Sequence, residues 1–116
     1  MANVETDLTL IGGPTVLIEC FGLRLLTDPT FDEPGSYESA GIMLEKRSGP
    51  ALSVDDLGRI DAVLLSHDQH FDNFDRAGRQ FSRRAKNTFT TPSGAKRLVQ
   101  CYIDFLVVRM RLSVSA

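Results

Sequence analysis

The sequence predicts an α/β fold, more narrowly α+β, in which an antiparallel β-meander precedes strand–loop–helix units. Three short aliphatic segments follow one another between residues 7 and 28, and their connections are too short for a crossover. A continuously apolar run at 61–66 has the composition of a strand that is covered on both faces. Apolar residues at helical spacing follow that run, which indicates a helix after the strand.

The first half of the chain contains the meander and a long loop. Strands are expected at residues 7–11, 15–20 and 23–28, because these segments are short and rich in β-branched and aliphatic residues. The turn between the first two is Gly-Gly-Pro, and Gly22 marks the second reversal. Four prolines and glycines and no apolar period predict a loop at 28–41, and 42–50 is expected to be irregular.

The second half alternates helices and strands. Ser53 is expected to cap a short helix at 53–60, with Asp56 at its third position. The predicted order after it is strand 61–66, helix 73–85, strand 87–91 and helix 92–100. After Leu98 the chain becomes aliphatic and basic without turn residues, and both a strand and a buried helix fit. We therefore expect a structured portion at 1–98 and an atypical tail at 99–116.

Length, charge and cysteine content exclude several classes of protein. The chain has 116 residues, which favours one domain, and its net charge of −2 leaves no basic face for nucleic acid or a membrane surface. Cys20 and Cys101 are expected to be free buried thiols in a reducing compartment. No signal peptide is expected at the polar start, and the apolar stretch near the C-terminus is too short for a bilayer. The expected location is the cytoplasm.

The segment LLSHDQHFDNFD at 64–75 gathers the chemically active residues. Both histidines of the chain lie in it, and five candidates for a metal site follow the expected strand: His67, Asp68, His70, Asp72 and Asn73. Imidazole and carboxylate groups in one turn suit a divalent metal, with zinc as the first choice and manganese as the alternative. A metal-bound water becomes a nucleophile at neutral pH, and an aspartate beside it accepts the proton. The alternative is a structural turn whose acids cap the next helix.

At these residues the sequence resembles the metallo-β-lactamase fold superfamily, whose metal motif is H-x-H-x-D-H after a buried strand. The opening TLIGGPTVLIECFGLRLLTDPTF is similar to the meander of its UlaG-like branch, although Gly13 stands where that branch often has histidine. The resemblance covers about residues 7–98. It implies a metal-dependent hydrolase in which metal-bound water attacks an ester, lactone, amide or phosphodiester, with Asp72 as a catalytic residue and metal ligand.

Two alignments to the metal motif remain open. If His70, Asp72 and Asn73 occupy its last three positions, Asp68 takes the first and His67 lies one residue early. If His67 takes the first position, Gln69 stands where the second histidine belongs. Neither alignment supplies the full ligand set.

The resemblance also implies that this chain is the N-terminal half of an αβ/βα sandwich. In the superfamily, the remaining ligands come from a second half, and no histidine follows His70 here. We therefore expect a truncated and inactive member, or a subunit that obtains the missing ligands from a partner chain. Because the second half would cover one face of the sheet, self-association through an uncovered face is also expected. A non-catalytic interaction module is the alternative function, and the substrate cannot be deduced.

Overall fold

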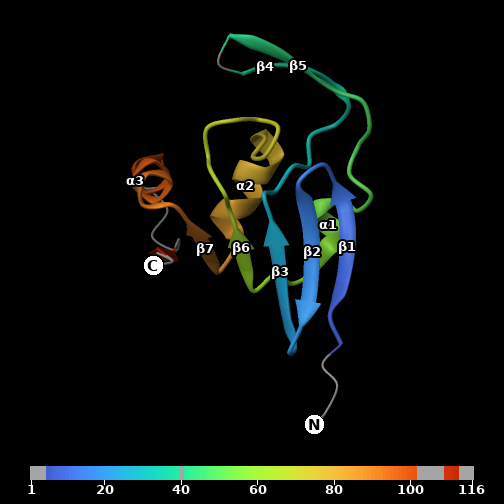
Figure 1. Cartoon of the computed structure of the whole chain (residues 1–116), viewed down its shortest axis with the longest axis vertical. Coiled ribbons are helices and arrows are strands. Elements are labelled where there is room, and N and C mark those ends of the chain that lie inside the picture. Colours follow the sequence, from blue (N-terminus) through green and yellow to red (C-terminus); the bar gives the residue numbers. More distant parts are fainter. Residues whose placement is uncertain (1–4, 40, 102–108, 113–116) are drawn as a thin grey trace.

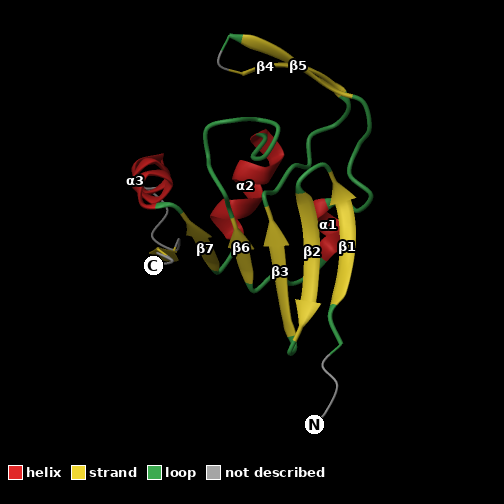
Figure 2. Cartoon of the chain, viewed as in Figure 1, coloured by secondary structure: helices red, strands yellow, loops and turns green. Residues whose placement is uncertain are grey.

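The computed structural model describes residues 5–39, 41–101 and 109–112. One six-stranded sheet has the order β1-β2-β3-β6-β7-β8, and β4 and β5 form a separate hairpin that projects beyond it (Figures 1 and 2). The strands are β1 (Asp7–Gly12), β2 (Thr15–Cys20), β3 (Leu23–Thr27), β4 (Gly35–Ser39), β5 (Ile42–Lys46), β6 (Ala62–Leu64), β7 (Asn87–Thr90) and β8 (Arg109–Leu112). The helices are α1 (Val54–Leu57), α2 (Arg76–Arg84) and α3 (Pro92–Cys101).

The predicted meander is confirmed in strands β1 to β3, which pair antiparallel. Gly13 has a φ of +51° at the first turn, and Gly22 has a φ of +74° at the second. Phe21 also has a positive φ of 51°, so both central residues of the second turn have the left-handed backbone that fits a two-residue hairpin. These turns keep the three strands adjacent and set their register.

The remaining strands of the sheet are parallel. β6 pairs with β3, β7 with β6, and β8 with β7. Each of these connections includes a helix or a long loop, as parallel pairing requires. The parallel strands end at the same edge of the sheet, and this edge receives the loop that carries both histidines.

The core lies between one face of the sheet and the helices. Leu17, Leu26 and Val63 are in register across β2, β3 and β6, and each is 2 % exposed or less. Phe81 of α2 packs against Phe31 with ring centroids 5.8 Å apart. The predicted covering of the fourth expected strand is confirmed by the burial of Ala62 and Val63.

The start of α1 and the start of α2 are each fixed by a capping side chain. The Ser53 side chain accepts a hydrogen bond from the Asp56 backbone N–H at 3.1 Å, which confirms the predicted cap of α1. The prediction that the next helix begins at residue 73 is wrong by about one turn. Asp75 caps α2 through the Gly78 backbone N–H at 2.8 Å, so residues 73 and 74 belong to the preceding loop.

The hairpin of β4 and β5 is a correction to the predicted loop at 28–41 and irregular segment at 42–50. Tyr37 lies opposite Leu44 in this hairpin, and Glu38 lies opposite Met43. The prediction failed because the hairpin has no side buried in the main core, so its sequence carries serine, glutamate and lysine instead of an apolar alternation.

The described residues leave part of the second face of the sheet exposed to solvent. Leu8 and Leu10 of β1 are 68 % and 64 % exposed, and their cross-strand partners Ile18 and Val16 are half-buried. Of the tail, α3 extends to Cys101 and β8 adds an edge strand, whereas 102–108 and 113–116 lie outside the described residues. The proposed boundary after residue 98 stays a prediction.

Cys20 is a free, half-buried thiol, and the side chain of Cys101 lies outside the described residues. Within the described residues, no helix has both the length and the apolar composition that a membrane crossing requires.

Candidate metal centre

The segment 65–75 is called the histidine loop. It begins where β6 ends, beside the ends of β3 and β7. The Leu65 backbone N–H donates to the Phe89 carbonyl at 2.8 Å, and the Asp28 backbone N–H donates to the Leu64 carbonyl at 2.9 Å. Asp28 follows β3 directly, and its positive φ of 31° turns the chain at this point. In open α/β sheets the carboxyl ends of parallel strands are the usual place for a functional site.

The structure brings His67 and His70 together. Their ring centroids are 5.2 Å apart and the planes meet at 67°, in an edge-to-face arrangement. His67 is half-buried, and His70 is exposed. The Phe74 backbone N–H donates to the His70 carbonyl at 3.0 Å, which closes the turn between the second histidine and α2. The two residues between the histidines therefore do not separate the imidazoles in space.

A chain of side-chain hydrogen bonds orients His67. The Asp28 carboxylate accepts from the Ser66 backbone N–H at 2.7 Å and from the Ser66 hydroxyl at 2.8 Å. Ser66 Oγ lies 3.0 Å from Nδ1 of His67. Because the single hydroxyl proton of Ser66 is donated to Asp28, Oγ accepts a hydrogen bond from Nδ1–H of the imidazole. This tautomer leaves Nε2 of His67 with a free lone pair, as metal-binding histidines require.

Asp68 lies between the histidines, but its carboxylate faces α3. Arg97 donates through Nε to Oδ2 at 2.8 Å and through Nη2 to Oδ1 at 2.5 Å, and Asp68 is 4 % exposed. The hydrogen bonds from Arg97 hold the pKa of Asp68 below its usual value, against the opposing effect of burial. This bidentate pair anchors the loop to α3 and occupies lone pairs that a metal ion would need.

Asn73 and Asp72 occupy different environments. Asn73 is buried, and its side-chain amide donates to the His67 carbonyl. Its Oδ1 atom is buried with no hydrogen-bond partner among the described residues. Asp72 is exposed and lies on the wall of a cavity beside the loop. An unpartnered buried oxygen is costly, so Asn73 Oδ1 is a suitable acceptor for a donor or a cation.

These residues form a partial donor set for a metal ion. His67 and His70 supply two imidazoles, and Asn73 supplies an unpartnered amide oxygen. Zinc takes about four ligands. Across residues 5–39, 41–101 and 109–112, no three His, Cys, Asp or Glu side chains lie together as a metal site. The described residues alone therefore do not fit a complete metal centre.

Several residues that support the loop were missed from the sequence. The Asp75 carboxylate caps α2 and also accepts backbone N–H groups of Phe31 and Asp32 at 3.0 and 2.7 Å. Asp32 in turn accepts from the Ala77 backbone N–H at 3.0 Å. Arg97 comes from a distant helix, so only its tertiary position reveals its role. An aspartate near the start of an expected helix, a common N-cap residue, was the available signal for Asp75.

The Phe71 side chain lies under two arginines of α2. The guanidinium carbons of Arg76 and Arg79 are 5.9 and 6.0 Å from its ring centroid, and Arg79 also lies 4.6 Å from the Phe74 ring. Arg79 donates to the Asp68 carbonyl as well. Two arginines of α2 therefore pack on aromatic rings of the loop.

No protein-family model matches the chain. A curated relative, N-acyl-phosphatidylethanolamine-hydrolyzing phospholipase D 1 of Caenorhabditis elegans, is 33 % identical over 67 residues, which are 58 % of this chain and 18 % of the relative.

Two solved structures resemble the fold. The isothiocyanate hydrolase from Delia radicum gut bacteria has a TM-score of 0.68 and 27 % identity, with 90 % of this chain and 41 % of that one covered. A possible metal-dependent hydrolase from Veillonella parvula DSM 2008 has a TM-score of 0.71 and 21 % identity, with 93 % and 42 % covered. This chain thus spans less than half the length of both structures. The predicted resemblance is confirmed at the level of the fold: the chain has a metallo-β-lactamase-like α/β fold and matches 41 % and 42 % of these two structures, as half of such a domain would.

Proposed function

We propose that this chain is the N-terminal portion of a metal-dependent hydrolase, and that its two histidines contribute to the metal site. The observation that carries the proposal is the edge-to-face pair of His67 and His70, with Nε2 of His67 left free by the hydrogen bonds through Ser66 to Asp28. The similarity to two hydrolases of the same fold supports the reaction class.

The metal ion, zinc first and manganese second, would supply an activated water for attack on an ester, lactone, amide or phosphodiester. His67 and His70 are the proposed ligands from this chain, with Asn73 Oδ1 beside them. Asp72, the exposed acid of the loop, is the proposed catalytic carboxylate. Asp68 is the weakest of the five candidates, because Arg97 binds both of its oxygens.

The other ligands would come from a second half of the domain or from a partner chain. The similar structures are more than twice as long as the matched region, which supports a contribution from further residues. We propose that the chain by itself is inactive, because two imidazoles and one amide oxygen hold a metal ion more weakly than four ligands.

A non-catalytic interaction module is the second candidate function. The observation that favours it is the tight structural use of the loop acids, since Asp68 binds Arg97 and Asp75 caps α2. In that case the two histidines would only stabilise the turn and would bind no metal ion.

Metal titration separates the two candidates. We expect the purified chain, monitored by isothermal calorimetry and by the visible spectrum of bound Co²⁺, to bind one ion. His67→Ala and His70→Ala should each abolish binding. Gln69→Ala, which changes an exposed side chain between the two histidines, is the matched control and should leave binding unchanged. Uptake that survives in both histidine variants would contradict the proposal and favour the interaction module.

A further inference from the structure

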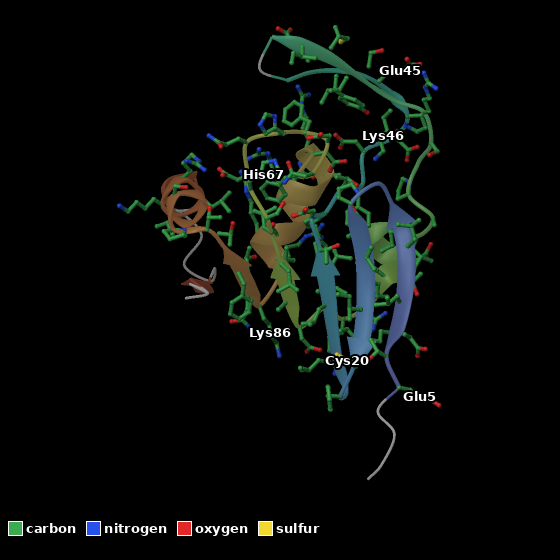
Figure 3. All side chains as sticks on the ribbon, in the orientation of Figure 1. Glu5, Cys20, Glu45, Lys46, His67 and Lys86 are labelled. Carbon is green, nitrogen blue, oxygen red and sulfur yellow. The ribbon has the colours of Figure 1, made fainter. Side chains whose placement is uncertain are left out.

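A cavity of about 360 Å³ lies between the hairpin and the histidine loop. Tyr37 and Leu44 of the hairpin form its roof, the turn around Gly13 and Pro14 forms another wall, and Asp72 lies at its border with the loop. In Figure 3, Glu45 and Lys46 of β5 lie at the same end of the molecule as His67, away from Cys20 and Lys86. The volume is within the range of small-molecule sites.

The register of the hairpin explains which side chains enter the cavity. Tyr37 and Leu44 are cross-strand partners, so both point to the same face of the hairpin. The neighbouring pair, Glu38 and Met43, points to the opposite face, where Met43 is 66 % exposed. One face of the hairpin therefore carries the roof, and the other faces solvent.

Three of the six charged side chains on the cavity walls, Asp32, Lys46 and Asp75, already bind other groups of the protein. Asp75 accepts three backbone N–H groups, and Lys46 Nζ lies 3.5 Å from its Oδ2 atom. Asp32 accepts backbone N–H groups at the start of α2. The Tyr37 hydroxyl donates to the Glu33 carbonyl at 2.6 Å. These contacts occupy three of the charged groups, while Glu45, Arg47 and Asp72 also lie on the walls, and the surface of the cavity is mainly apolar.

We propose that this cavity holds an uncharged apolar substituent of the substrate, an aromatic ring or a short alkyl chain, with the bond to be hydrolysed at the Asp72 border. This inference rests on the proposed hydrolase function and adds the substrate class to it. Leu44 and Tyr37 contact the apolar group from above. Selection against an anionic substituent follows from the lining, because an anion would lose water against a mainly apolar surface on which four acidic side chains outnumber two basic ones.

Binding of two small probes to the full chain tests the proposal without metal. Acetophenone is neutral and benzoate is the charged probe of similar size, and both are titrated in EDTA while backbone amide signals are followed by NMR. We expect saturable shifts with acetophenone around Leu44, Gly13 and Phe71, and at least tenfold weaker binding of benzoate. Leu44→Arg should weaken acetophenone binding at least tenfold. Met43→Arg adds the same charge on the outer face of the same strand and should change it less than twofold.

Leu44→Trp is a second variant that keeps the hairpin apolar and fills the cavity, so it should also exclude acetophenone. Equal losses in Leu44→Arg and Met43→Arg would overturn the proposal. Shifts centred on Leu8 and Leu10, or equal affinity for benzoate, would overturn it as well. Because EDTA removes metal, an absence of probe binding in a chain that binds Co²⁺ would reject the apolar subsite alone and leave the proposed hydrolase function standing.

Discussion

Arg97 of α3 binds both carboxylate oxygens of Asp68, at 2.8 and 2.5 Å, and thereby fixes the histidine loop to a helix about thirty residues further along the chain. Arg97→Gln would leave a buried carboxylate without its bidentate partner, which costs about 1–3 kcal/mol. Arg97→Lys should recover only part of the stability, because an ammonium lacks the planar fork of a guanidinium.

Urea unfolding measures this effect, and Arg59→Gln is the matched control. Arg59 lies 3.4 Å from Asp61, but its side chain is 63 % exposed, so its removal should change the unfolding midpoint far less. Equal midpoints for Arg97→Gln and the native chain would show that the pair does not anchor the loop.

The same pair predicts a stability that depends on pH. Arg97 lowers the pKa of Asp68 in the folded chain, so the carboxylate stays ionised where its unfolded form is already protonated. Stability from the pair is therefore fully present above the unfolded pKa of about 3.9, and it is lost as the pH falls through the lower folded pKa. Urea midpoints of the native chain and Asp68→Asn should differ at pH 6, and the difference should shrink progressively as the pH falls below about 4. A constant difference across that range would contradict the assignment.

At Gly78, α2 lies close to the loop after β3. A Cβ atom built there would lie 1.9 Å from the Pro29 carbonyl oxygen, so the helix must move to accept any side chain. We expect Gly78→Ala to destabilise the fold by about 1–3 kcal/mol or more, although alanine is the better helix former. Gly12→Ala is the control, because a Cβ atom there meets nothing within 4 Å. Thermal unfolding should separate the variants, and equal midpoints would rule out the close approach.

Local patterns in the sequence predicted the parts of the fold that depend on burial. β2 was expected at residues 15–20 and is found there, because its side chains must be apolar to cover the core. The hairpin was missed because Tyr37 and Leu44 face a cavity and not the core. The pairing of Asp68 with Arg97 was also missed, since it joins residues 29 positions apart and no local pattern encodes it. The candidate site was predicted from its composition and its resemblance to a metal motif, and the site and its ligand roles stay predictions.

The hydrogen bonds from His67 through Ser66 to Asp28 predict a fixed tautomer. Ser66→Ala removes the acceptor of the Nδ1 proton, so the imidazole should become a mixture of its two neutral tautomers. Nitrogen chemical shifts of His67, measured above pH 8, report this change directly. His70 is the internal control and should keep its shifts. A native chain in which Nε2 of His67 already carries the proton would contradict the arrangement.

The exposed face of the sheet predicts self-association of the chain when it is studied by itself. Leu8 and Leu10 of β1 stand on this face beside the half-buried Ile18 and Val16, and a contiguous apolar surface of this kind favours contact with a second copy. We expect sedimentation velocity to show a concentration-dependent dimer or larger species. The double variant Leu8→Lys, Leu10→Lys should shift the chain toward the monomer. Ile42→Lys, which changes a residue of the hairpin that is 64 % exposed, should not. A monomer at all concentrations, or an equal effect of the hairpin variant, would remove the sheet face as the contact surface.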